Sequence, residues 1–346
     1  MKHALLPIVA IFFFLSCDEQ QKKVVEAEKP FTNADACLFS EIAYCNNPQP
    51  QLDKYTPGWK VVWNAVALNG NHAFIASDGS KYVLSIRGSL MEFSWDAFEN
   101  WIYQDLNIVS QDKWSYTTSG SDAKVSTGSY RGFQNLIKLK DKDSGKDILG
   151  FFQENVKEET PVIITGHSLG GNLATVLASY LSFKLKEINH PAKNMNVITF
   201  AAPAAGNAAF AKDFNEKFPQ SIRIENEGDI VPKFPCTSAI ASLAKLYASS
   251  PSAAEITVGY NNMSVPLSTV FKGMSTIVSG LQLASGFSSF TQTNGDGTII
   301  KVKLSGKNLT NDISSWFAEA GYQHSVAQYA ASMGAPVIEE CNAVVK

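Results

Sequence analysis

Residues 162–174 read Val-Ile-Ile-Thr-Gly-His-Ser-Leu-Gly-Gly-Asn-Leu-Ala. A β-branched run is followed by Gly-x-Ser-x-Gly and then by residues that favour a helix, which is the strand–turn–helix context of a nucleophile elbow. We expect the turn to be too tight for side chains at Gly166 and Gly170, and the backbone strain to lift the Ser168 hydroxyl clear of the sheet. The helix that begins at Leu169 would aim its first N–H groups at developing negative charge. Ser168 is therefore the candidate nucleophile, and a structural turn is the alternative.

A serine hydroxyl is a weak nucleophile unless a histidine takes its proton and a carboxylate orients that histidine. Of five histidines, His324 stands just ahead of a predicted helix and is the candidate base. The others lie in the amino-terminal segment, before the serine, within its turn or in a helix-to-strand loop: His3, His72, His167 and His190. Asp229 ends a predicted strand and is the candidate acid. Its rivals lie in a helix, earlier at the same strand end or in a later insertion: Asp213, Glu225, Glu227, Asp296 and Asp312.

Short β-rich runs alternate with helical patterns along the chain. Strands are predicted at 60–63, 82–87, 161–165, 196–201 and 221–226, and helices at 35–44, 95–104, 130–140, 169–186, 208–218 and 325–332. This alternation predicts an α/β fold with a mainly parallel central sheet and helices on both faces. Residues 34–346 form the predicted hydrolase domain. Residues 236–322 are rich in Ser, Ala and Gly, lie between the candidate acid and base, and are interpreted as a large insertion. Within it, helices are predicted near 239–248 and 267–287, and a turn at 294–297 is predicted to lead into a strand at 298–304.

Composition restricts the class of protein. The chain has 346 residues, 45% of them hydrophobic and 18% charged, which is typical of a folded protein with a large core. The formal net charge is -3, and this balance argues against nucleic-acid binding. The catalytic pattern requires no metal or cofactor.

The amino terminus is predicted to be a targeting segment. A short basic start precedes an apolar run over 4–15, so residues 1–16 are interpreted as a signal peptide. Ser16-Cys17 resembles the end of a bacterial lipobox, which predicts a lipid anchor on Cys17, a flexible tether over 17–33, and export to the cell envelope at the outer membrane. Ordinary signal cleavage and secretion is the alternative.

Four cysteines remain in an exported chain once Cys17 is excluded, namely Cys37, Cys45, Cys236 and Cys341. They can form two disulfides in any of three ways. Four buried free thiols are the alternative.

The order Ser, Asp, His resembles that of α/β-hydrolases. Four blocks resemble the class 3 lipase family of triacylglycerol lipases, phospholipases and feruloyl esterases: 85–89 with Asn100-Trp101, 165–171, 226–235, and His324-Ser325 with Tyr329. The resemblance runs from about residue 35 to the carboxyl end. It implies an α/β-hydrolase fold in which Ser168 is the nucleophile, Asp229 orients the base and His324 is the base.

The resemblance also implies an oxyanion hole and a lid. The hole would be formed by the Leu169 N–H and by Ser89, which otherwise belongs to an ordinary strand-ending turn. The lid would be the segment that follows, with the apolar side chains Met91, Phe93, Trp95 and Phe98, and a core-packing helix is the alternative.

The same family pattern implies a disulfide between Cys45 and Cys341. Within one helix Cys37 and Cys45 would be about 12 Å apart, too far for a disulfide. Cys37 would then pair with Cys236.

The sequence therefore predicts a monomeric serine hydrolase for carboxylic esters that acts through an acyl-enzyme, with lipid esters as substrates and its anchor in a membrane. Three alternatives stay open. A feruloyl- or acetyl-type esterase would act on polysaccharides, a serine peptidase fits the triad alone, and a surface-binding protein could keep the fold without activity.

Overall fold

The computed structural model describes residues 30–90, 94–100, 106–107, 110–118, 122–240, 242–243, 246–247, 256–260, 263–285, 289–295, 297–305 and 312–338. The chain divides into two compact units, Met1–Phe31 and Thr32–Lys346, and the described helices and strands lie in the second. The predicted signal peptide, Cys17 and the predicted tether up to residue 29 lie outside the described residues.

A seven-stranded sheet forms the centre of the second unit. Its order is β1 (Lys60–Asn64), β2 (Ala73–Ser77), β3 (Tyr82–Ile86), β6 (Val162–His167), β7 (Met195–Phe200), β9 (Ile222–Asn226) and β13 (Thr298–Ile300). The first three strands pair antiparallel, and every pairing from β3 onward is parallel. The predicted mainly parallel sheet is therefore confirmed.

Strand β6 lies in the middle of this sheet and is buried along its whole length. Ile164 belongs to the core on the side of the long helix that follows the strand. Thr165 points to the opposite side, where its Oγ1 lies 2.8 Å from Ser40 Oγ. Burial on both faces explains why β6 reads as a continuous apolar and β-branched run instead of an alternating one.

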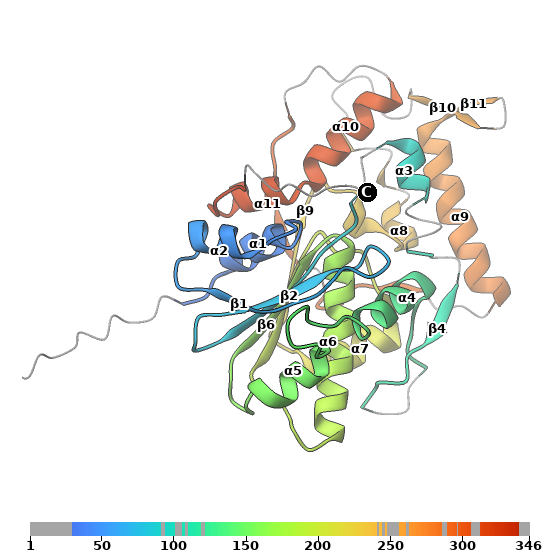
Figure 1. Ribbon diagram of the computed structural model, residues 1–346. Helices are drawn as coiled ribbons and strands as arrows, with labels where there is room; N and C mark the ends of the chain where they lie inside the picture. Colours follow the sequence, from blue (N-terminus) through green and yellow to red (C-terminus); the bar gives the residue numbers. More distant parts are fainter. Residues whose placement is uncertain are drawn as a thin grey trace, which may run out of the picture. The chain divides into compact units, whose positions relative to one another are not determined.

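Helices cover both faces of the central sheet (Figure 1). Helix α1 (Asn33–Ile42) packs on one side, and a group of four packs on the other: α4 (Thr127–Leu136), α5 (Ile148–Asn155), α6 (Leu169–Glu187) and α7 (Ala208–Lys217). Side-chain caps start several of them. Asp147 accepts from the Gly150 N–H at the start of α5, and Asn207 accepts from the Phe210 N–H at the start of α7.

The remaining elements lie around this core. They are α2 (Gln49–Tyr55), α3 (Trp95–Asn100), α8 (Thr237–Ile240), α9 (Leu267–Ser285), α10 (Ile313–His324), α11 (Val326–Ser332) and the 3₁₀ helix η2 (Val231–Lys233). A small sheet joins β12 (Phe290–Thr291), β8 (Gly206–Asn207), β5 (Lys124–Ser126) and β4 (Gln111–Lys113). A hairpin joins β10 (Thr257–Tyr260) to β11 (Met263–Pro266).

The segment predicted to be an insertion, 236–322, is divided between two roles. The hairpin and α9 are additions to the central sheet and its helices, whereas β13 pairs in parallel with β9 and completes the sheet. Helix α10, which the sequence did not predict, ends at His324. Part of this segment therefore belongs to the fold that builds the site.

A second hydrophobic cluster lies beside the main core and is formed largely by the later part of the chain. It includes Phe98 of α3, Phe234, Phe271 of α9 and Phe317 of α10. Leu169, the first residue of α6, packs against both clusters. The second cluster therefore adjoins the turn that carries Ser168.

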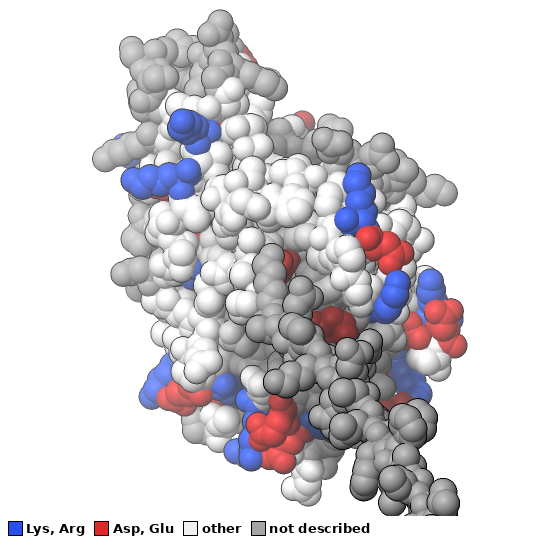
Figure 2. Space-filling model, turned by 90° about the vertical axis from the view of Figure 1, so that its left-hand side faces the viewer, with Lys and Arg blue, Asp and Glu red and all other residues white. Residues whose placement is uncertain are grey.

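The surface in Figure 2 carries charged side chains along its lower edge and right side, where basic and acidic groups lie next to one another, and basic side chains at its upper left. Such mixing agrees with ion pairs such as Lys81–Asp78, whose Nζ and Oδ2 atoms lie 2.7 Å apart. Among the described residues, no helix is long and apolar enough to cross a membrane.

Candidate active site

Ser168 lies in the turn between β6 and α6. Its φ of 59° and ψ of -131° lie outside the regions that most side chains adopt, so the backbone is strained as the elbow requires. A Cβ on Gly166 would come within 2.4 Å of Gly170 O. Glycine is therefore required at this position, as the sequence predicted.

Gly170 brings a second loop to the nucleophile. A Cβ here would lie 2.2 Å from Ile86 O at the end of β3, so only glycine lets α6 start so close to that strand. The residues after Ile86 reach Ser89, which lines the same pocket as Ser168. The Ser89 hydroxyl is buried and has no hydrogen-bond partner among the described residues. It is available to a group that enters the pocket.

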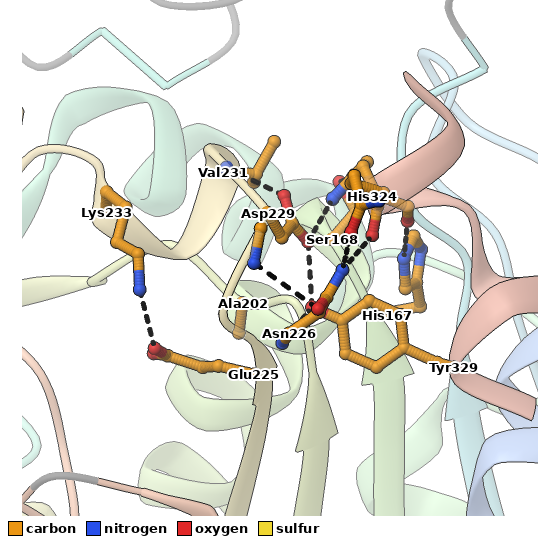
Figure 3. A network of polar contacts seen from close by, with 12 residues as sticks. His167, Ser168, Ala202, Glu225, Asn226, Asp229, Val231, Lys233, His324 and Tyr329 are labelled. Carbon is orange, nitrogen blue, oxygen red and sulfur yellow. Dashed lines mark hydrogen bonds and ion pairs between the residues drawn. The ribbon is translucent and has the colours of Figure 1, made fainter. Parts of the chain in front are cut away.

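The structure brings Ser168, His324 and Asp229 into one chain of hydrogen bonds (Figure 3). His324 Nε2 lies 2.8 Å from Ser168 Oγ, and its Nδ1 lies 2.8 Å from Asp229 Oδ2. The three residues come from the ends of β6 and α10 and from the loop after β9. The exposed fraction is 3% for Ser168, 0% for Asp229 and 4% for His324. Each side chain has the partner that its predicted role requires.

The Asp229 carboxylate is held by three donors. Oδ1 accepts from the Val231 N–H at 2.9 Å, and Oδ2 accepts from the Tyr329 hydroxyl at 2.8 Å in addition to His324. Burial, followed by the nearby Asp229 charge, raises the pKa of the Tyr329 hydroxyl well above its usual value. Tyr329 therefore keeps its proton and remains a donor.

Asn226, the last residue of β9, connects the acid to the base. Its N–H donates to the Tyr329 oxygen at 2.8 Å, and its Nδ2 donates to the backbone oxygen of Gln323 at 2.9 Å. Gln323 is the residue before His324. The sequence placed residue 226 in a family block but assigned it no role, because these contacts span about 100 positions.

A pocket of about 220 Å³ opens beside the nucleophile. Ser168, Ser89 and His324 line it together with Tyr44, His167, Gly321, Ser325 and Val326. Tyr44 was not predicted as a site residue, and in the sequence it was only the last residue of the predicted helix over 35–44.

The predicted lid is described in part. Met91 and Phe93 lie outside the described residues, and of Trp95 only the backbone, in α3, is described. Phe98 is fully buried. Its ring lies 5.2 Å from that of Phe234 and 5.4 Å from that of Phe317, between ring centroids. In this arrangement α3 is held against the second cluster by a core contact.

The predicted pairing of Cys37 with Cys236 is wrong, because both are free. Cys37 on α1 points its sulfur toward the Val326 oxygen at 4.0 Å, and Cys236 points toward the Phe290 oxygen at 3.7 Å. They face different parts of the fold. Cys45 is disulfide-bonded. Its expected partner Cys341 lies outside the described residues, so that pairing stays a prediction.

A parallel sheet, a strained serine between strand and helix, and the chain order Ser, Asp, His define an α/β-hydrolase fold. Residues 83–239, just under half of the chain, match the model of the family described as Lipase (class 3).

Parts of the chain are similar to known proteins. The chain is 35% identical over 74 residues to Lipase ZK262.3 of Caenorhabditis elegans, which is 21% of this chain and 20% of that protein. It is 25% identical over 169 residues to Secreted mono- and diacylglycerol lipase 1 of Fusarium solani. These residues are 48% of this chain and 43% of that protein. The chain thus spans less than half the length of these curated relatives.

The crystal structure of M37 lipase has a similar fold, with a TM-score of 0.69 at 24% identity, covering 88% of this chain and 92% of that one. This likeness shows the fold that the two chains share.

Proposed function

We propose that this protein is a lipase-type serine hydrolase that cleaves carboxylic esters of lipids, acylglycerols or phospholipids, through an acyl-enzyme. The proposal is carried by the continuous hydrogen-bond chain from Ser168 Oγ through His324 to Asp229, with 2.8 Å at each step. The family match and the similarity to curated lipases support the ester-hydrolase class.

The reaction follows from this arrangement. Ser168 Oγ attacks the ester carbonyl carbon while His324 Nε2 takes its proton, and Asp229 stabilises the imidazolium through the Nδ1–H. The oxyanion that forms is stabilised by the Leu169 N–H at the start of α6 and by the Ser89 hydroxyl. His324 then donates the proton to the leaving alcohol. Water attacks the acyl-serine in the same way and releases the acid.

Lipid substrates are favoured by the apolar surroundings of the nucleophile. Ser168 is only 3% exposed and is reached through the pocket of about 220 Å³, so we expect a long-chain ester to need more room than this pocket offers. The second cluster adjoins Leu169, and Phe98 connects α3 to it. Displacement of α3 would remove Phe98 from Phe234 and uncover an apolar surface for an acyl chain beside Ser168.

Export is part of the proposal. The signal peptide over 1–16 and the lipid anchor on Cys17 are supported by the sequence alone. They would place the enzyme at the cell envelope, where its lipid substrates are.

The test is hydrolysis of p-nitrophenyl esters from acetyl to palmitoyl by the purified protein, with the Ser168→Ala variant as control. Measurements are made below and above the concentration at which the substrate aggregates. The proposal predicts activity that rises with chain length and with aggregation and that disappears in the variant. A short-chain preference without an increase on aggregation would favour the polysaccharide esterase. A folded protein that neither hydrolyses any ester nor reacts with a fluorophosphonate would contradict the enzyme assignment.

A further inference from the structure

His167 precedes the nucleophile and is buried, with 4% of its surface exposed. Both of its ring nitrogens have partners. Nε2 lies 2.7 Å from the backbone oxygen of His324, and Nδ1 lies 3.0 Å from the hydroxyl of Tyr44. The imidazole therefore spans from the loop after α1 to the end of α10.

These partners determine where the proton of His167 is. A backbone carbonyl only accepts, so Nε2 carries the hydrogen and donates it to the His324 oxygen. Nδ1 then holds a lone pair and accepts from the Tyr44 O–H. Burial, followed by repulsion from His324, lowers the pKa of His167 well below its usual value, and burial raises that of Tyr44. Both groups stay neutral in the pH range of ester hydrolysis.

The carbonyl that accepts this bond lies at the carboxyl end of α10, whose last residue is His324. The donor belongs to the residue next to Ser168. The contact thus ties the backbone of the base directly to the backbone of the nucleophile.

A neutral group is required at this position. The ring centroids of His167 and His324 lie 4.6 Å apart, and His324 becomes positively charged when it takes the Ser168 proton. A second charge at this distance would oppose that step, whereas the neutral Nε2–H form holds the base without repelling the charge that develops on it.

We propose that His167, oriented by Tyr44, is a positioning residue that fixes the backbone of His324 relative to Ser168, and that it works only as the neutral Nε2–H tautomer. This inference rests on the proposed function, because it assigns His324 as the base. A misplacement of about 1 Å at a reacting group costs about 100-fold in rate, which sets the scale of the effect.

The test compares His167→Leu, which removes the donor, with His167→Gln, whose Nε2 amide can still donate to the His324 oxygen. His190 provides a matched control, because its Nε2 also lies 2.7 Å from a backbone oxygen, that of Val156, away from the pocket. We expect His167→Leu to lower kcat on p-nitrophenyl esters by about 100-fold with KM almost unchanged. The kcat of His167→Gln should be at least about tenfold higher than that of His167→Leu, and His190→Leu should keep wild-type kcat.

Tyr44→Phe provides a second, milder variant. Its loss in kcat should be smaller than that of His167→Leu, and the double variant should lose no more than His167→Leu alone, because both act through one contact. Nitrogen-15 NMR of labelled histidine should show His167 as the Nε2–H tautomer at pH 7.

A folded His167→Leu protein with kcat within a few-fold of wild type would overturn the proposal, and so would a loss confined to KM. If His167→Leu does not fold, the NMR measurement and Tyr44→Phe decide. An Nδ1–H or doubly protonated His167 would refute the proposal, and so would a Tyr44→Phe variant with wild-type kcat. A wild-type protein that hydrolyses no ester would instead reject the proposed function, and the NMR measurement would still test the contact of His167 with His324.

Discussion

Replacing Ser89 by alanine should lower kcat without lowering the free energy of unfolding. The Ser89 hydroxyl lines the pocket with Ser168, is buried, and has no hydrogen-bond partner among the described residues. Loss of one oxyanion donor lowers kcat by about 100 to 1,000-fold, or about 2.7 to 4 kcal/mol of transition-state stabilisation. We expect Ser89→Ala to show a loss of this size with little change in KM, because the oxyanion forms only after substrate has bound.

Stability should not fall in the same variant. A buried hydroxyl without a partner costs about 1 to 3 kcal/mol of desolvation, so its removal should leave the free energy of unfolding unchanged or slightly higher. Ser85, four residues earlier in β3, provides the matched control, since its hydroxyl donates to the Phe39 oxygen at 2.9 Å. Ser85→Ala should lose about 1 kcal/mol of stability and keep its kcat.

The assay measures kcat and KM on a p-nitrophenyl ester together with urea unfolding for wild type, Ser89→Ala, Ser89→Thr and Ser85→Ala. Ser89→Thr retains a hydroxyl and should keep most of the activity. If Ser89→Ala retains kcat within about threefold of wild type, far from the expected range, the side chain is not an oxyanion donor. A loss of stability equal to that of Ser85→Ala would refute the conclusion that the hydroxyl is unpaired.

Three further predictions concern the triad and two buried titratable groups. Asp229→Asn should lower kcat by about 10⁴ with the fold intact, because an amide no longer fixes the tautomer of His324, and steady-state kinetics with circular dichroism checks this. Burial raises the pKa of Glu41 from 4.5 to about 7, so the stability it contributes is full below pH 4.5 and lost as the pH rises through about 7. In Glu41→Gln, the free energy of unfolding should no longer fall between pH 4.5 and 8, a fall of up to about 3 kcal/mol in the wild type. Unfolding curves over this pH range measure it, and the same pH dependence in variant and wild type would contradict the prediction. Burial, followed by the charge of Arg87, lowers the pKa of His72 from 6.5 to about 4, so its contribution is full above pH 6.5 and lost as the pH falls through about 4. His72→Gln should flatten the acid side of the stability profile without changing kcat.

Local patterns were sufficient for the elements that run along the chain. The β-branched run before Gly166 and the helix formers after Ser168 specify strand, turn and helix within a few residues, and the structure has β6 and α6 there. The elbow needs no distant contact for its prediction, because its tightness follows from the two glycines themselves. The parallel sheet was predictable for the same reason, since alternating strands and helices can pack in few other ways.

Other elements required the tertiary structure. Strand β2, from Ala73 to Ser77, is fully buried and was not predicted. Strand β13 lies within the predicted strand over 298–304, but the sequence assigned that strand to an insertion. Only the structure shows that it pairs with β9 and completes the sheet, because the identity of a partner strand is not encoded in a local pattern. The Cys37–Cys236 pairing failed because elimination among cysteines contains no information on which sulfurs face each other.

The sequence by itself determined which residue types could perform the chemistry and in what order they occur: Ser168, Asp229, then His324. Only the tertiary structure decided how they are held. The contacts of Asn226 with Tyr329, and of His167 with the His324 backbone, join residues 103 and 157 positions apart. Contacts of this range leave no local periodicity in the sequence. They exist only because the sheet brings the ends of β6 and β9 to one edge, where α10 meets them.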